Sequence, residues 1–280
     1  MIVISVRFTA GRFHATPWGH HVNEGAPEWP PSPWRLLRGL IASWKLTMPE
    51  VEDDRIQRLV SYLSVPPDFH LPRGMANHTR HYMPLYEGER RPVLDSFIAV
   101  SPESPVYFVW KGELEQEDKT LLQSLLSNLS YFGRAESWCR AELIDACEKP
   151  NCRWVGPDEP IPANMDLVRV LAPKENATLE ELMVDTLIMR NKQKRLEPPG
   201  SVWLLYARER ESLSPLPRRP VAASMSSQRL TVARYAIDSV PLPLVTATVN
   251  IAELARRAIM AQYGRANDGE ICPLYLRERR

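Results

Sequence analysis

The chain is rich in proline and poor in glycine, with 26 prolines against 12 glycines in 280 residues. Proline fixes its backbone φ angle and cannot donate a backbone hydrogen bond, which limits where a helix or an inner strand can run. At about twice its average share, proline favours extended, pre-shaped connections over flexible glycine hinges. We therefore expect long ordered loops between the regular elements.

Composition and charge are those of an ordinary folded protein. Hydrophobic residues make up 44% of the chain and charged residues 25%, which argues against a disordered, collagenous or coiled-coil chain. The length suffices for one large domain or two small ones. Lys and Arg nearly balance Asp and Glu, 35 against 34, leaving a formal net charge of +1. A surface that binds nucleic acid must therefore be local.

The sequence disfavours several kinds of site and location. The four cysteines form no C-x-x-C pair, so we expect reduced thiols rather than a zinc site or a disulfide scaffold. The sequence contains no G-x-S-x-G, Walker or G-x-G-x-x-G motif, which leaves a serine hydrolase, an NTPase or a dinucleotide enzyme without support. No cofactor is expected. The N-terminus lacks the pattern of a signal peptide, and no apolar run approaches the ~20 residues of a membrane helix. We expect a cytoplasmic protein with no membrane partner.

Periodicity predicts strands that alternate with helices. Two-residue alternation and short apolar runs predict strands at residues 2–9, 106–110, 167–171, 202–206 and 229–237. Apolar stripes with capping residues predict helices from Ser32-Pro33, over 53–63, between the cap Asp118 and Gly133, from the capping box Thr178-x-x-Glu181, and from the cap Asn250 to Gly264. The alternation of the first strand is that of a half-buried strand.

Strands alternating with helices favour an α+β fold of the ferredoxin-like (RRM-like) kind with long loop insertions. Residues 66 to about 104 are punctuated by proline and resemble an insertion, and residues 212–220 are the best linker candidate. We expect one domain over residues 1–220 and, over 221–280, the beginning of a second ferredoxin-like unit that is too short to close its own core.

Three separated stretches resemble one known family. They are GRFHATPWGHHVNEGAPEWPPSPWRLLRGL within residues 11–44, His81-Tyr82-Met83-Pro84, and Tyr131-Phe132-Gly133-Arg134-Ala135-Glu136-Ser137-Trp138. Over about residues 1–145 the chain resembles the CRISPR-associated protein of subtype I-G (formerly I-U), of the RAMP superfamily, and the match is looser to about residue 263. That protein fuses the Cascade subunit that binds the 5′ handle of CRISPR RNA (crRNA) to the endoribonuclease that cleaves the repeats.

The resemblance implies a ferredoxin-like RAMP domain that binds crRNA and the backbone and large subunits of Cascade, with target DNA as a further partner to consider. In the family, the nuclease half carries a histidine-containing segment beyond the point where this chain ends. All six histidines of this chain lie within its first 81 residues. The expectation is a truncated nuclease half, and RNA binding without cleavage.

Cations and aromatic residues are interleaved in the first loop and helix. Single-stranded RNA is held by that combination, because Arg and Lys contact phosphates and aromatic faces stack on bases. Residues 190–235 add ten Lys or Arg against three Glu, which suits phosphate contacts but is also typical of a solvated surface. The candidate RNA-binding residues are Arg7, Arg12, His14, Trp18, His20, Arg35, Arg38, Arg134, Arg218 and Arg219.

Some of these features have a structural alternative. Trp29, Trp34 and Trp44 suit a hydrophobic core as well as an RNA contact. Arg134 can hold a phosphate or pair with Glu136. The pair His78-x-x-His81 has no acidic or cysteine partner at a metal-binding spacing, so no metal is expected.

Three functions remain open at this point. The leading hypothesis is a non-catalytic RNA-binding subunit that holds the crRNA 5′ handle and organises assembly of the Cascade complex for antiviral defence. The alternative is a metal-independent endoribonuclease that processes repeat RNA, for which His20 is the one reasonable general base; the histidine motif that would favour it is missing from the second half. The third is a scaffold that contacts only protein.

Overall fold

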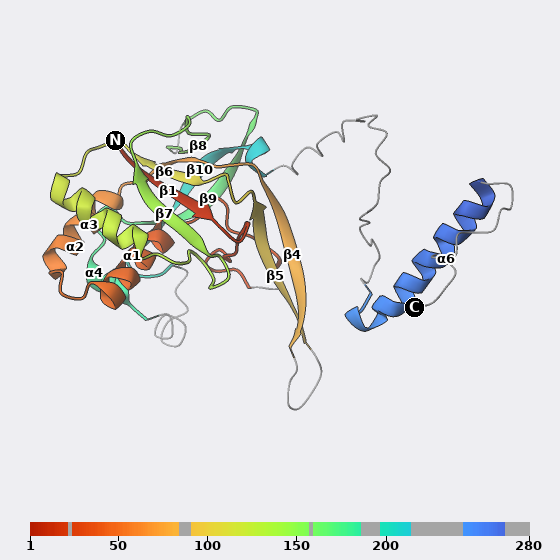
Figure 1. Cartoon of the computed structure of the whole chain (residues 1–280). Coiled ribbons are helices and arrows are strands. Elements are labelled where there is room, and N and C mark those ends of the chain that lie inside the picture. The colour runs from red at the N-terminus through yellow and green to blue at the C-terminus, as the bar shows by residue number, and fades with distance from the viewer. Residues whose placement is uncertain (22–23, 84–90, 157–158, 186–196, 214–242, 267–280) are drawn as a thin grey trace. The chain divides into compact units, whose positions relative to one another are not determined.

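The structure is a computed structural model that describes residues 1–21, 24–83, 91–156, 159–185, 197–213 and 243–266 (Figure 1). The chain divides into two compact units, Met1–Arg219 and Pro220–Arg280. In the second unit the structure describes a 3-10 turn, η3 (Val245–Ala247), and the helix α6 (Thr248–Ala266). The predicted strand 229–237 and the linker beyond residue 213 lie outside the described residues, so a second ferredoxin-like unit stays a prediction.

The first unit is built on a seven-stranded sheet with the order β7-β1-β6-β3-β8-β10-β9. Its strands are β1 (Ile2–Phe8), β3 (Asp68–His70), β6 (Val106–Trp110), β7 (Cys139–Ile144), β8 (Cys152–Trp154), β9 (Met165–Pro173) and β10 (Ser201–Glu209). Strands predicted at 2–9, 106–110, 167–171 and 202–206 are confirmed to within a few residues. The sequence did not predict β3, β7 or β8.

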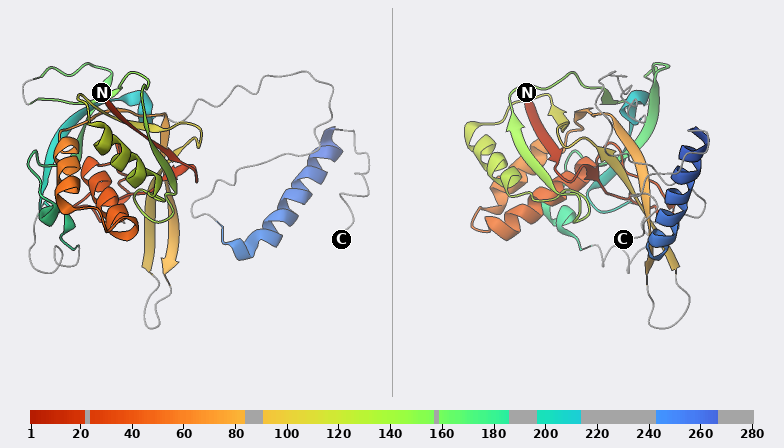
Figure 2. Two further views of the ribbon diagram at one scale, coloured as in Figure 1. Left: turned by 60° about the vertical axis from the view of Figure 1, so that its left-hand side comes forward. Right: turned by 45° about the vertical axis from the view of Figure 1, so that its right-hand side comes forward.

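The described helices of the first unit gather on one side of this sheet (Figures 1 and 2). They are α1 (Pro33–Thr47), α2 (Asp53–Leu63), α3 (Gln116–Ser127) and the short α4 (Leu179–Met183). The predicted starts of α1 and α4 are confirmed. Ser32 caps α1 by accepting a hydrogen bond from the Arg35 backbone N–H, and the capping box of Thr178 and Glu181 is formed at α4. Among the described residues, no helix has both the length and the hydropathy that crossing a membrane requires.

The strand order identifies a ferredoxin-like arrangement. Along the chain the elements follow as β1, α1, β3, β6, α3 and β7, with α2 added after α1, and in the sheet the same strands lie in the order β7-β1-β6-β3. Each neighbouring pair is antiparallel. This is the βαββαβ topology, and it confirms the predicted α+β, ferredoxin-like class. Strands β8, β10 and β9 extend the sheet beyond β3.

The first strand is buried on both faces, so the prediction of a half-buried strand was wrong. Ile4, Val6 and Phe8 are fully buried, and on the opposite face Val3 and Ser5 are only 1% and 3% exposed. Both edges of β1 are paired, because it lies between β7 and β6, and the burial of Val3 and Ser5 shows that its second face is covered as well. Alternation along a strand indicates which residues share a face but not whether tertiary packing covers that face.

The predicted cap of α3 was also wrong. The helix begins at Gln116 after Glu115, and Asp118 lies within its first turn. Asp118 is buried, and one of its carboxylate oxygens lies 3.6 Å from Arg58 of α2. A carboxylate in a first turn is favourable whether or not it is the cap, because the helix dipole places partial positive charge there.

The proline-punctuated stretch contains a long hairpin of β4 (Gly74–Met83) and β5 (Arg91–Val100), which projects from the first unit (Figure 1). With β2 (Arg12–Phe13) these strands form a second sheet of order β2-β5-β4. Aromatic contacts join this sheet to the first one, because the Phe13 ring lies 5.1 Å from Phe8 and 5.6 Å from Phe132. The residues at the start of the first loop are therefore anchored in the core.

Gly133 is required where the loop before β7 crosses the first loop. Its φ is +104°, and a Cβ built there would lie 2.5 Å from the backbone oxygen of His14. The His14 oxygen also accepts a hydrogen bond of 2.8 Å from the Arg134 backbone N–H. The glycine of the third family-like stretch is thus explained by a close approach of two backbones.

We predict that Gly133→Ala lowers the free energy of unfolding by about 2 kcal/mol or more, because the substitution combines a positive φ with a backbone clash. Chemical denaturation measures this change. Gly156→Ala is the matched control, because a Cβ at Gly156 meets nothing within 4 Å. Equal stability of the two variants would contradict the assignment.

Candidate nucleic-acid interface

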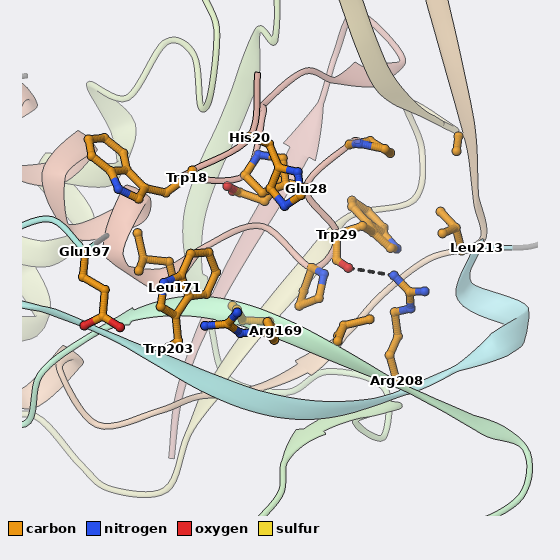
Figure 3. Close-up of a pocket in the computed structure, with 17 residues that line it drawn as sticks. Trp18, His20, Glu28, Trp29, Arg169, Leu171, Glu197, Trp203, Arg208 and Leu213 are labelled. Carbon is orange, nitrogen blue, oxygen red and sulfur yellow. Dashed lines mark hydrogen bonds between the residues drawn. The ribbon is translucent and has the colours of Figure 1, made fainter. Parts of the chain in front are cut away.

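A cleft of about 670 Å³ lies between the first loop, residues 11–31, and the strands β9 and β10 (Figure 3). Trp18 and His20 line it from the loop side, and Arg169 and Trp203 line it from the strand side. We call this part the aromatic end. Trp29 and Arg208 lie together farther along the cleft, and we call that part the Arg208 end.

The loop wall is held in place by the buried carboxylate of Glu28. Its two oxygens accept hydrogen bonds from Arg35 Nε at 3.1 Å and Arg35 Nη2 at 2.8 Å, and from the Ser32 backbone N–H at 2.9 Å. Arg35 Nη2 also donates to the backbone oxygen of Thr16 at 3.1 Å. Burial opposes the charge on Arg35, but the Glu28 carboxylate outweighs that effect and raises the pKa of the guanidinium. This bidentate pair fixes both ends of the loop segment 16–28 against α1.

The same network joins the two walls of the cleft. The Ser32 hydroxyl donates a hydrogen bond of 2.6 Å to the backbone oxygen of Leu171 on β9. Arg208 of β10 donates from Nη1 to the backbone oxygen of Trp29 at 2.7 Å. The spacing between loop and strands is therefore set by two bonds that each connect residues more than a hundred positions apart.

The aromatic end offers surfaces for stacking beside positive charge. The Trp18 ring packs edge-on against Trp34 with ring centroids 6.0 Å apart, and Trp18 keeps part of its surface exposed. Across the cleft, the Arg169 guanidinium lies 4.8 Å from the centre of the Trp203 ring. Half-exposed tryptophans next to an exposed arginine can hold flat rings by stacking and anions by charge.

His20 lies at the rim of the cleft and is oriented by a carboxylate. Its Nδ1 lies 2.6 Å from Glu24 Oε2, and both side chains are about half exposed. Hydrogen bonds from the His21 backbone N–H and from His20 lower the pKa of Glu24. A carboxylate on Nδ1 leaves Nε2 free to exchange protons, which is the geometry of a general acid or base.

Trp18 and His20 are the two sequence-predicted residues that the structure brings to the cleft. Arg38 instead donates to the backbone oxygens of Leu182 and Val184. Arg35 binds Glu28 as described above, so both arginines of α1 hold the fold together. Arg218 and Arg219 lie outside the described residues.

Four further candidates lie away from the cleft. His14 is buried and pairs with Glu136, and Arg134 pairs with Asp95 at 2.9 Å. Arg12 is exposed and lies over the Phe97 ring, 5.4 Å from its centre. Arg7 is half-buried on β1, where its partner across the sheet is Arg140 of β7.

The rings of Trp29, Trp34 and Trp44 pack in the hydrophobic core, whereas Trp18 keeps part of its surface exposed. Trp29 and Trp34 are each 5% exposed, and Trp44 is fully buried. The described residues contain no group of three or more His, Cys, Asp or Glu placed to hold a metal ion.

Sequence reasoning missed Arg169 and Trp203 and gave Arg208 no individual role. Each lies in a strand, among apolar residues that define the strand pattern, so its polarity or size carries no site signal by itself. The detectable signals were a lone arginine inside the apolar strand 167–171 and the membership of Arg208 in the cationic run 190–235. Neither signal indicates that these residues face the first loop.

We predict that Glu28→Gln lowers the free energy of unfolding by about 2 kcal/mol, because it leaves the guanidinium of Arg35 without its counter-charge. Thermal or chemical unfolding measures the change. Glu211→Gln breaks an exposed pair with Arg73 and should cost less than about 1 kcal/mol. A Glu28 variant as stable as the Glu211 variant would show that the pair does not hold the loop.

Neither the comparison with family models nor that with curated proteins finds a match for this sequence. Among solved structures, the chain is similar to Thermus thermophilus Cas6, with a TM-score of 0.28 and 16% sequence identity. The alignment covers 51% of this chain and 53% of the Cas6 chain, so it spans about half of each. At that score the ferredoxin-like assignment rests on the strand topology described above.

Proposed function

We propose that this protein is an RNA-binding subunit that holds a single strand in the cleft between the first loop and β9–β10. The observation that carries the proposal is the aromatic end, where Trp18 and the Arg169–Trp203 pair line opposite walls. Stacking of bases between aromatic or guanidinium faces, with cations beside them for phosphates, is the usual way in which proteins hold unpaired RNA.

The charge distribution supports this proposal. The chain as a whole is nearly neutral, so a nucleic-acid site depends on cations that are not already paired within the fold. Arg35 and Arg38 are engaged in the fold, whereas Arg169 is exposed on the strand wall and its described contact is with an aromatic ring. A strand would therefore be gripped locally rather than over a broad basic surface.

In finer detail, we propose that the bound strand is the 5′ handle of crRNA and that the protein acts in the cytoplasm within a type I CRISPR Cascade complex for antiviral defence. Its further partners would be the backbone and large subunits, and target DNA is a partner to test. The support is the stretch at residues 11–40 that resembles the subtype I-G family, because this stretch forms the loop wall of the cleft and the start of α1.

We predict that the double variant Trp203→Ala with Arg169→Gln weakens binding of a repeat-derived single-stranded RNA by about tenfold or more, because it removes one stacking face and one cation. Fluorescence polarisation at moderate salt measures the affinity. Trp154→Ala is the control, because Trp154 is an exposed tryptophan of β8 that does not line this cleft.

An equal loss in the Trp154 control, or unchanged affinity in the double variant, would remove the cleft as the RNA site. Absence of RNA binding by the intact protein would favour the third hypothesis, a scaffold that contacts only protein.

A metal-independent endoribonuclease is the second candidate function, because His20 and Glu24 form a hydrogen-bonded pair at the rim of the cleft. Cleavage by attack of a ribose 2′-hydroxyl needs a general base near that hydroxyl and a geometry in line with the leaving oxygen. Both side chains of the pair are about half exposed, so the base is present at a place that water can reach.

We therefore predict that the protein, incubated with repeat RNA and a metal chelator, binds the RNA and leaves it intact over hours. Gel analysis of end-labelled RNA measures this. A discrete product that ends in a cyclic phosphate, disappears in His20→Ala and persists in the control His78→Ala would overturn the binding-only proposal. His78 is exposed on β4 and does not line the cleft.

A further inference from the structure

Two buried donors at the Arg208 end of the cleft have no acceptor. Among the described residues, neither Arg208 Nε nor the Trp29 indole Nε1 has a hydrogen-bond partner. Arg208 is 7% exposed and Trp29 is 5% exposed. A buried donor without a partner is costly, and the cost is larger when the donor belongs to a charged group.

The charge of Arg208 is also weakly compensated within the fold. Its Nη1 donates to a neutral acceptor, the backbone oxygen of Trp29. The nearest carboxylate oxygen, on Asp166, lies 3.9 Å from Nη2, and Asp166 is part-exposed and already accepts a hydrogen bond from Arg210. Burial lowers the pKa of Arg208, and Cys152 and Asp166 oppose this only in part. Within the described residues, the guanidinium therefore lacks a closely paired counter-charge.

The two residues that carry these donors line the same cleft. Figure 3 shows the Trp29 ring and the Arg208 guanidinium next to each other, on the side of the cleft away from Trp18 and Trp203. A ligand for this place must accept hydrogen bonds and carry negative charge. A phosphoryl group meets both conditions, and Arg binds it with directed N–H donors.

We propose that the Arg208 end is a phosphate subsite, in which Arg208 and the Trp29 indole N–H bind one phosphodiester group of the RNA whose bases stack at the aromatic end. The inference rests on the proposed RNA-binding function. It places the RNA along the cleft, with bases at the aromatic end and a phosphate at the Arg208 end. A neutral acceptor such as water can occupy the donors but cannot balance the charge.

Tryptophan indole signals in a proton–nitrogen correlation spectrum provide a direct test. The chain has eight tryptophans, and Trp29→Phe identifies the Trp29 signal while keeping an aromatic ring in the core. Inorganic phosphate and uridine 5′-monophosphate should move the Trp29 indole signal in the wild-type protein, because the N–H gains an acceptor. Uridine, which lacks the phosphate, should leave it in place, and Arg208→Gln should abolish the response to phosphate.

RNA affinity provides the second readout. Trp29→Phe and Arg208→Gln should each weaken binding of repeat-derived RNA by about tenfold. Arg208→Gln should also reduce the slope of log affinity against log salt by about 0.7, the value for one phosphate contact on a single strand. Arg55→Gln, on α2 and outside the cleft, removes the same charge and should change neither quantity.

The outcomes separate this inference from the proposed function. If RNA binds but neither phosphate nor the nucleotide moves the Trp29 signal, the subsite is overturned and the RNA-binding proposal stands. If phosphate moves the signal but RNA does not bind, the subsite stands as a site for free phosphate and the RNA-binding proposal falls. A response to uridine alone would show that the donors bind a base carbonyl, which also overturns the phosphate subsite.

Discussion

The ion pair between Glu28 and Arg35 is the interaction on which the cleft depends. The described part of the loop between β2 and α1 forms no strand or α-helix. Its shape depends on turn-like backbone bonds, such as that from the Glu28 N–H to the Ala15 oxygen at 3.0 Å, and on bonds made by side chains. Glu28 bonds to the start of α1, and Arg35 reaches back to Thr16. A buried carboxylate is tolerated only with a partner, so loss of either residue releases the wall that carries Trp18 and His20.

The opposite wall comes from the extension of the ferredoxin-like sheet. The helices cover one side of the sheet (Figures 1 and 2), and the added strands β8, β10 and β9 carry the sheet past β3. Ser32 and Arg208 bond the first loop to this extension. The cleft thus forms where an irregular loop meets a regular sheet, so one wall is fixed by the backbone ladder and the other by a few polar side chains.

The fold alone does not determine function, because ferredoxin-like units serve many activities. The chemistry comes from the cleft. Its lining offers aromatic faces for stacking, the exposed guanidinium of Arg169, and the buried guanidinium of Arg208 with one N–H that has no acceptor. The His20–Glu24 pair adds a proton-exchanging group at the rim. Binding of an unpaired strand uses every one of these features except the histidine pair, and this is why binding rather than cleavage is the proposed function.

Local signals in the sequence determined much of the helical layer, because caps and apolar stripes act over only a few residues. Ser32-Pro33, residues 53–63 and the Thr178 capping box each correspond to an observed helix. Strands β3, β7 and β8 were not predicted, because each is short and is stabilised by pairing with distant segments. The candidate site was predicted only for Trp18 and His20. The tertiary structure decided the rest. Four of the predicted residues pair within the fold instead of lining the cleft, namely His14, Arg35, Arg38 and Arg134. Three residues that are more than a hundred positions from the first loop line the cleft on the strand side, namely Arg169, Trp203 and Arg208.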